Sequence, residues 1–200
     1  TIMTSTNSVR ILQWNCNGIL HRLPDLKNYL ATLKHEPDVI CLQETHLQES
    51  KQLKLPTYIT ERKDRTTGQQ KGGVAILIKQ HYTYSVLDHI QSLEEISIKI
   101  KFRNRELNIT NIYNPPRNKI DLATYQPLAS RTNLIMLGDF NAHSSLFGSN
   151  TTNQEGQAME TIIEQHDLAV LNDKTGTFIK TNGELSPIDL TLCSRNLSLQ

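Results

Sequence analysis

The segment NLIMLGDFNA, residues 133–142, carries the pattern that decides the fold of this sequence. Its first half is a short apolar run, which predicts a buried strand, and Gly138 ends that run. Asp139 and Asn141 follow directly, so a carboxylate and an amide stand where the strand stops. The segment therefore predicts a buried strand whose end carries polar groups suited to chemistry on a charged substrate.

Four other polar clusters fall where a predicted strand begins or ends. They are Trp14-Asn15-Cys16-Asn17-Gly18, Gln43-Glu44-Thr45, Tyr113-Asn114-Pro115-Pro116 and Ser186-Pro187-Ile188-Asp189-Leu190. One carboxylate can hold a hard cation such as Mg²⁺, a second can activate water, and amide or phenol donors can stabilise developing charge. Together the clusters indicate metal-assisted chemistry on phosphates.

Each cluster also has a purely structural interpretation. Asn17-Gly18 is a common turn pair, and Glu44 could be the first solvated residue after a buried run. Asp139 could form an Asx-turn, and Tyr113 could be a half-buried aromatic residue at a strand end. No single cluster decides between structure and chemistry.

Apolar periodicity predicts many short strands and few helices. The predicted strands cover residues 9–15, 38–43, 74–79, 96–113 as a hairpin, 133–137, 168–171, 176–180 and 188–192. A helix is predicted over residues 23–33 with Pro24 in its first turn, and another helix starts at a capping box over residues 152–155. This mixture favours an α/β sandwich of two packed sheets with helices outside.

The 200-residue chain has a mass of 22.8 kDa and is 37% hydrophobic and 20% charged. These values predict a single domain over residues 1–200 and exclude a disordered or collagen-like chain. No stretch approaches the roughly 18 consecutive apolar residues that a membrane span needs. The three cysteines cannot all pair and lack metal-ligand spacing, so we expect a globular protein of a reducing, intracellular compartment.

The net charge of +1 at pH 7 neither indicates nor excludes a polyanionic partner. Residues 96–105 alternate between apolar side chains and the basic residues Lys99, Lys101, Arg103 and Arg105. This basic strand face is either a solvated outer face or a surface that contacts DNA phosphates. Both interpretations stay open.

Taken in order, the clusters resemble the motif series of the endonuclease/exonuclease/phosphatase superfamily. The matching motifs are WNCNG, QET, Tyr-x-Pro at residues 113–115, GDFNA and S-x-x-D-L at residues 186–190. The residues after GDFNA narrow the resemblance to the apurinic/apyrimidinic-type endonuclease domain of non-LTR retrotransposons, and it extends over residues 9–194. The resemblance implies a four-layer α/β sandwich of two packed, mostly antiparallel sheets with outer helices, with the active site at one rim.

The resemblance implies a role for each motif residue in the first half of the chain. Glu44 would be the principal ligand of Mg²⁺, with Mn²⁺ as the alternative metal, and Asn17 would stand beside it at the metal. Asn15 would contact phosphate, and Tyr113 would donate a hydrogen bond to a phosphate oxygen. Many superfamily members have Asp where Asn17 stands.

The resemblance assigns further roles in the second half. Asp139 would orient and activate the attacking water, and Asn141 would hold that water in line. Asn153 and Ser186 would contact phosphate or DNA. Asp189 resembles the carboxylate that pairs with a catalytic histidine.

That histidine belongs to a Ser-Asp-His motif on a last strand, and no such motif occurs in this chain. We therefore expect a C-terminally truncated endonuclease domain without its last strand, or a protein that lacks part of its catalytic apparatus. Thr1 before Met3 favours a piece of a longer polyprotein.

The resemblance implies a Mg²⁺-dependent DNA endonuclease that nicks one strand of double-stranded DNA. The 3′-hydroxyl left at the nick would prime reverse transcription by a downstream domain of the same polyprotein. Such a protein would be made in the cytoplasm and act in the nucleus, with no membrane partner. The alternatives are an abasic-site repair endonuclease, another phosphoesterase of the superfamily, and a DNA-binding fragment without catalysis.

Overall fold

The computed structural model describes residues 8–66, 71–173, 176, 178–179, 185–186 and 188–198, with only the backbone described at 178–179, 185–186 and 198. None of the helices in this part of the chain has the length and apolar character that crossing a membrane demands.

The first sheet has the strand order β1-β2-β4-β3. Its strands are β1 (Ile11–Asn15), β2 (Val39–Gln43), β3 (Tyr58–Lys63) and β4 (Val74–Lys79). β1 and β2 are parallel, and the other pairs are antiparallel. Both faces of this sheet are covered, which is why β2 and β4 read as continuous apolar runs instead of alternating ones.

The second sheet has the order β5-β6-β7-β8-β12-β9, and only its β7–β8 pair is parallel. Its strands are β5 (Tyr84–Val86), β6 (Glu94–Phe102), β7 (Arg105–Tyr113), β8 (Leu134–Asp139), β9 (Leu168–Val170) and β12 (Asp189–Ser194). A small antiparallel pair joins β10 (Phe178–Ile179) to β11 (Leu185–Ser186).

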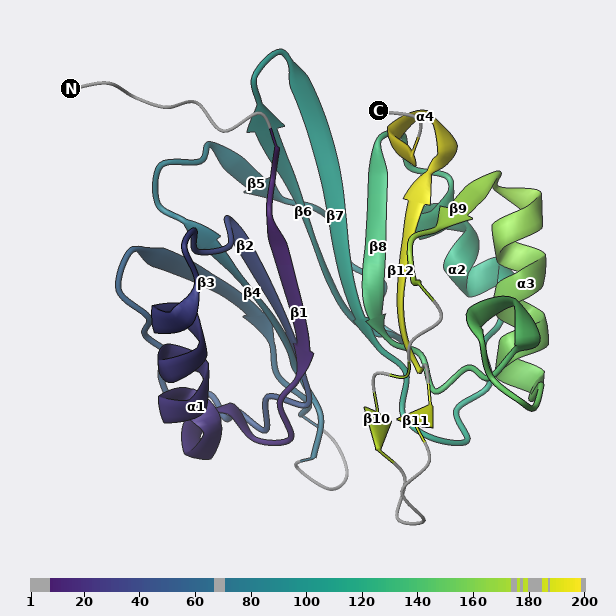
Figure 1. Ribbon diagram of the computed structural model, residues 1–200, viewed down its shortest axis with the longest axis horizontal. Helices are drawn as coiled ribbons and strands as arrows, with labels where there is room; N and C mark the ends of the chain where they lie inside the picture. The colour runs from purple at the N-terminus through teal and green to yellow at the C-terminus, as the bar shows by residue number, and fades with distance from the viewer. Residues whose placement is uncertain are drawn as a thin grey trace.

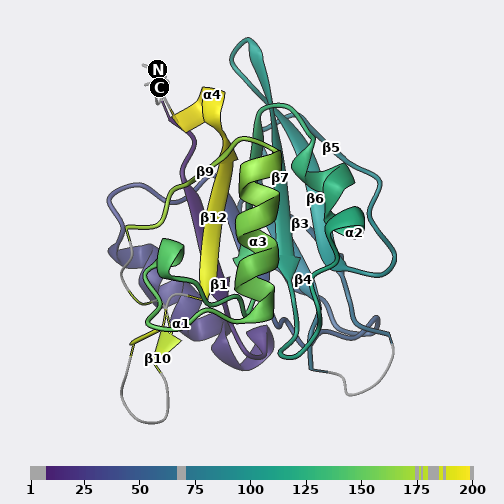
Figure 2. The ribbon, with the colours of Figure 1, turned by 90° about the vertical axis from the view of Figure 1, so that its right-hand side faces the viewer.

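Helices cover the outer faces of both sheets, which gives four layers (Figures 1 and 2). The helical elements are α1 (Ile19–Thr32), α2 (Leu122–Ala129), the 3₁₀ turn η1 (Ser145–Phe147), α3 (Gln154–Gln165) and the short α4 (Arg195–Ser198), which follows the end of β12. α1 packs on the first sheet through Leu26 and Leu30, and α3 packs on the second through Met159 and Ile162. The predicted α/β sandwich is confirmed.

A polar contact fixes how the two sheets face each other close to one rim. Asn111 of β7 is fully buried, and its Nδ2 donates to the carbonyl oxygens of Leu42 and Ala75 in the first sheet, 2.9 Å away in each case. Its Oδ1 accepts a hydrogen bond from Gln43 Nε2 at 2.5 Å. Because buried polar groups need partners, sliding one sheet over the other would leave these groups unpaired.

The structure corrects several predicted elements. The strands β3 and β5 and the helix α2 were not predicted. α1 begins at Ile19, and α3 is capped by Asn153 instead of Thr152. Of the predicted strand over residues 176–180, the structure has β10 (Phe178–Ile179), and residues 177 and 180 lie outside the described residues.

The prediction that the four basic residues of segment 96–105 share one face of a single strand is also wrong. β6 ends at Phe102, and Arg103 lies in the turn with φ 55°. Arg105 belongs to the next strand, so only Lys99 and Lys101 share a face of β6. The hairpin turn needs a residue of positive φ, and this need overrides the sequence alternation.

Candidate active site

A hollow of about 420 Å³ lies where the ends of β1, β2 and β8 meet the start of β12, at the lower rim in Figure 1. It is lined by Gln13, Trp14, Asn15, Asn17, Glu44, Asp139, Asn172, Ile188, Asp189 and Thr191. Five of these residues were predicted from the sequence as site residues: Asn15, Asn17, Glu44, Asp139 and Asp189. The structure thus brings together side chains from both sheets.

The turn after β1 is attached to the segment that carries Glu44. Asn17 and Gly18 both have positive φ, 42° and 95°, which turns the chain from β1 into α1. The Gly18 N–H donates to the carbonyl oxygen of Glu44 at 2.8 Å. A Cβ on Gly18 would stand 3.2 Å from His46 Nδ1, so a glycine fits this approach better than a larger residue.

The Asn15 amide holds one carboxylate from each sheet. Its Nδ2 donates to Glu44 Oε1 at 3.0 Å and to Asp139 Oδ2 at 2.8 Å. The same side chain accepts a hydrogen bond from the Asn17 N–H at 3.3 Å. Asn15 therefore sets the spacing between the two carboxylates and orients them toward one space.

Gln13 positions the third carboxylate of the pocket, which belongs to Asp189. Gln13 lies two residues before Asn15 in β1, and its Nε2 donates to Asp189 Oδ1 at 3.1 Å. Asn172 supports the strand that carries Asp189, because its Nδ2 donates to the Asp189 carbonyl oxygen at 2.9 Å and its Oδ1 accepts from Thr191 N–H at 2.8 Å. Two amides of β1 thus bind two acids of the second sheet.

Among the carboxyl groups of the pocket, Asp139 has a pKa that its surroundings clearly raise. This side chain is 2% exposed and lies opposite Asp189 in the β8–β12 ladder. Burial, followed by the charge of Asp189, raises the pKa of Asp139 to about 7, although hydrogen bonds from Asn15 and from the Asn141 N–H oppose this rise. Asp139 can therefore exchange a proton near neutral pH.

Tyr113 stands beside the pocket, with the Glu44 carboxylate and Asp139 close enough to influence its hydroxyl group. Burial and the nearby Glu44 carboxylate raise the pKa of Tyr113 well above its usual value, so the phenol stays protonated and can act as a donor. The Arg65 guanidinium lies over the ring, 5.7 Å from its centroid, and is bound by Glu94. A Cβ on Gly72 would stand 2.5 Å from this guanidinium, so the glycine makes room for the ion pair.

Asn141 and Asn153 lie in a neighbouring hollow of about 380 Å³. The Asn141 Nδ2 donates to the Asn114 carbonyl oxygen at 2.9 Å. The Asn153 Oδ1 accepts from the N–H groups of Gly156 and His143, both at 2.8 Å, and its Nδ2 donates to the Asn141 carbonyl oxygen at 3.0 Å. The Asn153 amide therefore caps α3 and fastens the turn after Asp139; its contact with phosphate stays a prediction.

The other predicted nucleic-acid contacts lie apart from the carboxylates. Lys99, Lys101, Arg103 and Arg105 surround the far end of the β6–β7 hairpin, at the top of Figure 1, and Lys99 forms an ion pair with Glu106 at 3.2 Å. Their contact with DNA stays a prediction about that end of the molecule. Ser186 belongs to β11, and its side chain lies outside the described part of the chain.

Sequence reasoning missed Gln13, Asn172, Arg65 and His46. A signal existed for Gln13, because strand alternation places it on the same face as Asn15. His46 Nε2 lies 3.5 Å from Glu44 Oε2, close enough for an ion pair when the imidazole is protonated. The hydrogen-bond partners of Arg65 and Asn172 are distant in the sequence, so no local sequence pattern could have predicted the roles of these two residues.

The oxygen-rich composition of the pocket fits a hard divalent cation. Mg²⁺ prefers carboxylate and carbonyl oxygens and usually keeps several waters, so one or two carboxylates suffice. Glu44 and Asp139 face a common space, and Asn17 is exposed at its edge. Among the described residues, no three His, Cys, Asp or Glu side chains form a ready-made metal cluster.

The sequence is similar to one protein family and to several known proteins. Residues 12–200 match the Endonuclease/Exonuclease/phosphatase family. The chain is 29% identical over 160 residues to a probable RNA-directed DNA polymerase from transposon X-element of Drosophila melanogaster, covering 78% of this chain and 17% of that protein. The RNA-directed DNA polymerase from mobile element jockey of the same species is 23% identical over 184 residues, 90% of this chain and 20% of that protein. The chain thus spans about a fifth of the length of these relatives.

Solved structures share the fold at low sequence identity. The endonuclease domain of TRAS1, a telomere-specific non-LTR retrotransposon, has a TM-score of 0.75 and 21% identity, covering 95% of this chain and 86% of that one. An AP endonuclease from Archaeoglobus fulgidus has a TM-score of 0.69 and 20% identity, covering 96% and 89%.

Proposed function

Because this chain belongs to the Endonuclease/Exonuclease/phosphatase family, we propose that it is a metal-dependent endonuclease that nicks one strand of double-stranded DNA and leaves a 3′-hydroxyl. The observation that carries the proposal is the pocket in which Glu44, Asp139 and Asp189 are held by the amides of β1. Carboxylates fixed at one space, with a protonated phenol beside them, suit hydrolysis of a phosphodiester.

Each side chain has a defined task in this reaction. Asp139, with its pKa near neutrality, accepts a proton from the attacking water, and Asn15 keeps its carboxylate in place. Tyr113 stays protonated and donates a hydrogen bond from its hydroxyl group to a phosphate oxygen. Glu44 and Asn17 would hold a Mg²⁺ or Mn²⁺ ion, which supplies neutralisation of the phosphate charge when bound.

The cellular setting is proposed from the relatives. The proteins that this chain resembles in sequence carry the name RNA-directed DNA polymerase, and the chain corresponds to about a fifth of their length. We propose that a reverse transcriptase domain follows in the same polyprotein and extends the 3′-hydroxyl at the nick. Such a protein is made in the cytoplasm and acts on double-stranded DNA in the nucleus.

Relaxation of a supercoiled plasmid tests the proposal. The chain should relax the plasmid in Mg²⁺ but not in EDTA, and a DNA polymerase should extend the nick directly because its end is a 3′-hydroxyl. Asp139→Asn should lose this activity. Asp25→Asn is the matched control, since Asp25 is exposed on α1 and forms a surface ion pair with Arg22 at 3.4 Å. Binding of the plasmid without nicking in Mg²⁺ or Mn²⁺ would support the DNA-binding alternative instead.

The fold shared with an AP endonuclease makes abasic-site cleavage the second candidate. Initial rates on a plain duplex, on a duplex with one abasic site and on inositol phosphates separate the candidates. A plain duplex cleaved as fast as the abasic one supports the proposed function. A strong preference for the abasic duplex or for inositol phosphates would favour a repair enzyme or a phosphatase.

A further inference from the structure

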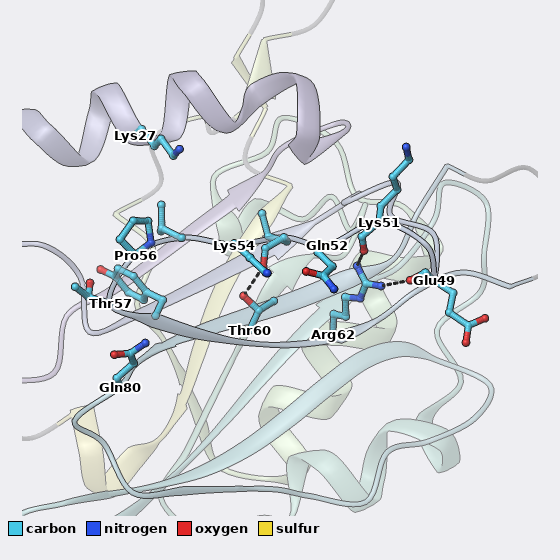
Figure 3. A pocket seen from close by; sticks show the side chains of 13 residues that line it. Lys27, Glu49, Lys51, Gln52, Lys54, Pro56, Thr57, Thr60, Arg62 and Gln80 are labelled. Carbon is cyan, nitrogen blue, oxygen red and sulfur yellow. Dashed lines mark hydrogen bonds between the residues drawn. The ribbon is translucent and has the colours of Figure 1, made fainter.

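A second hollow of about 910 Å³ lies on the outer face of the first sheet, between α1 and the segment that leads into β3 (Figure 3). Its lining residues are Lys27, Glu49, Lys51, Gln52, Leu53, Lys54, Leu55, Pro56, Thr57, Tyr58, Thr60, Arg62 and Gln80. None of them lines the carboxylate pocket. We call this hollow the α1 groove.

The floor of the α1 groove is held rigidly by the protein itself. Arg62 of β3 donates to the carbonyl oxygens of Lys51 at 2.6 Å, Gln48 at 3.2 Å and Glu49 at 3.4 Å. Thr60 Oγ1 donates to the Leu53 carbonyl oxygen at 3.2 Å. The groove therefore keeps its shape without a ligand, and the charge of Arg62 is already used for structure.

The other cationic side chains that line the α1 groove are three lysines without a carboxylate partner among the described residues. Lys27, Lys51 and Lys54 are exposed, and within the described ranges their ammonium groups form no ion pair. Nearby cations differ in this respect, since Arg62 is paired with Asp64 at 3.3 Å and Lys79 with Glu36 at 3.2 Å. Three ammonium groups along one hollow give it a positive potential, so a bound anion would lower the free energy of this surface.

The one acidic residue that lines the α1 groove does not neutralise it. Figure 3 shows the Glu49 side chain extending away from Lys51 and Lys54 at one end of the groove. Lys27 lines the groove from α1, and Lys51 and Lys54 line it from the segment before β3, so positive charge borders the hollow on both sides. Gln52, Thr57 and Gln80 add neutral donors along the same hollow. Ammonium and amide donors along an open groove suit a chain of phosphates better than a compact ligand.

We propose that the α1 groove binds the sugar-phosphate backbone of the DNA that flanks the nicking site. The groove and the site share one loop, because Glu49 follows Glu44 by five residues between β2 and β3. A DNA molecule held at the rim is a polyanion long enough to reach this neighbouring surface. The inference rests on the proposed function for its choice of DNA, and the contact is independent of base sequence.

Salt-dependent binding in EDTA tests the inference without any cleavage. The triple variant Lys27→Gln, Lys51→Gln, Lys54→Gln is compared with its charge-preserving control, Lys27→Arg, Lys51→Arg, Lys54→Arg. On a duplex of about 30 base pairs, roughly three helical turns, the slope of log affinity against log salt should decrease by about 2.7 in the Gln variant, or about 0.9 per lost contact. The Arg variant should keep the wild-type slope, and both variants should melt at the wild-type temperature.

Duplex length gives the second arm of the test. On a duplex of about 10 base pairs, one helical turn, the difference in slope between wild type and Gln variant should be smaller than on the long duplex, because a short duplex bound at the rim places fewer phosphates over the groove. Equal slopes for all three proteins on the long duplex would overturn the inference. So would a loss of affinity confined to single-stranded RNA or to an acidic peptide, which would assign the α1 groove to a different partner. A wild-type chain that shows the expected slopes but never nicks in Mg²⁺ would refute the proposed function alone.

Discussion

Asp139 is the residue on which the proposed chemistry depends most. Its surroundings raise its pKa to about 7, so the ionised form, which accepts the proton of water, becomes dominant only above that pH. We predict that the nicking rate rises with pH through about 7 and then levels off. Asp139→Asn should reduce the rate by on the order of 10²–10⁴ and retain duplex binding. A flat rate between pH 5.5 and pH 8.5 would remove Asp139 from the role of base, since its ionised fraction changes strongly over about that range.

The same pKa makes a prediction about stability. The folded state binds the Asp139 proton more tightly than the unfolded state, whose carboxyl has the usual pKa of 3.8. The free energy of unfolding should therefore fall as pH rises from about 4 to about 7, by an amount on the order of a few kcal/mol. Urea unfolding in EDTA at pH 5 and pH 8 measures this change. Asp139→Asn should show a smaller fall than wild type, and equal falls would contradict the assignment.

Gln13 tests whether the third carboxylate is positioned by β1. A hydrogen bond to a charged group contributes about 1.5–3 kcal/mol, so Gln13→Leu should slow nicking by about tenfold or more. Affinity for duplex in EDTA should stay at the wild-type value, because Gln13 acts through Asp189, to which its side chain donates a hydrogen bond. Gln157→Leu on the exposed face of α3 is the matched control. Wild-type nicking by Gln13→Leu would show that Asp189 needs no such support.

Among the elements, the turn that links β8 to α3 depends on one amide. Asn153→Ala removes the cap of α3 and the link to Asn141, and should lower the free energy of unfolding by about 1–2 kcal/mol. Asn153→Asp keeps the acceptor for the Gly156 and His143 N–H groups and should keep most of that stability. Urea unfolding of both variants measures the difference. If Asn153→Ala kept the wild-type stability but bound DNA more weakly, the result would contradict the capping role and support the predicted contact of Asn153 with phosphate.

Gly138 allows β8 to pass close to β7 immediately before Asp139. Its φ is 150°, and a Cβ there would collide with the carbonyl oxygen of Ile112. Gly138→Ala should therefore lower the free energy of unfolding by roughly 2–4 kcal/mol, combining overpacking and backbone strain. Thermal unfolding checks this value, and a wild-type melting temperature would mean that the two strands separate readily.

Elements with strong local patterns could be predicted from the sequence. The apolar run 74–79 and the strand before Gly138 were recognised because both faces of these strands are buried. β3 was not recognised, since its sequence YITERK is largely polar and its place in the sheet comes from pairing with β4. α2 was missed because its eight residues include Pro127 and its capping residue Asp121 gives only a weak signal.

At the scale of the whole molecule, the site depends on contacts between residues far apart in the chain. Gln13 and Asp189 are separated by 176 residues, and Asn15 and Asp139 by 124. The motifs predicted which carboxylates matter, because their residue types and order are distinctive. The contacts of the amides that hold these carboxylates form only when the two sheets pack together. The α1 groove, on the outer face of the first sheet, forms only when α1 packs on that sheet.

In the proposed function, the carboxylate pocket is a metal-dependent site for phosphodiester cleavage. The most direct measurement is the rate of plasmid nicking as a function of Mg²⁺ concentration for wild type, Glu44→Gln and the control Glu164→Gln, whose side chain is exposed on α3. We predict saturable, EDTA-sensitive nicking by wild type and control, and a loss on the order of 10²-fold or more in Glu44→Gln with an unchanged melting temperature. Nicking by Glu44→Gln at the wild-type rate and with the wild-type Mg²⁺ dependence would contradict the claim.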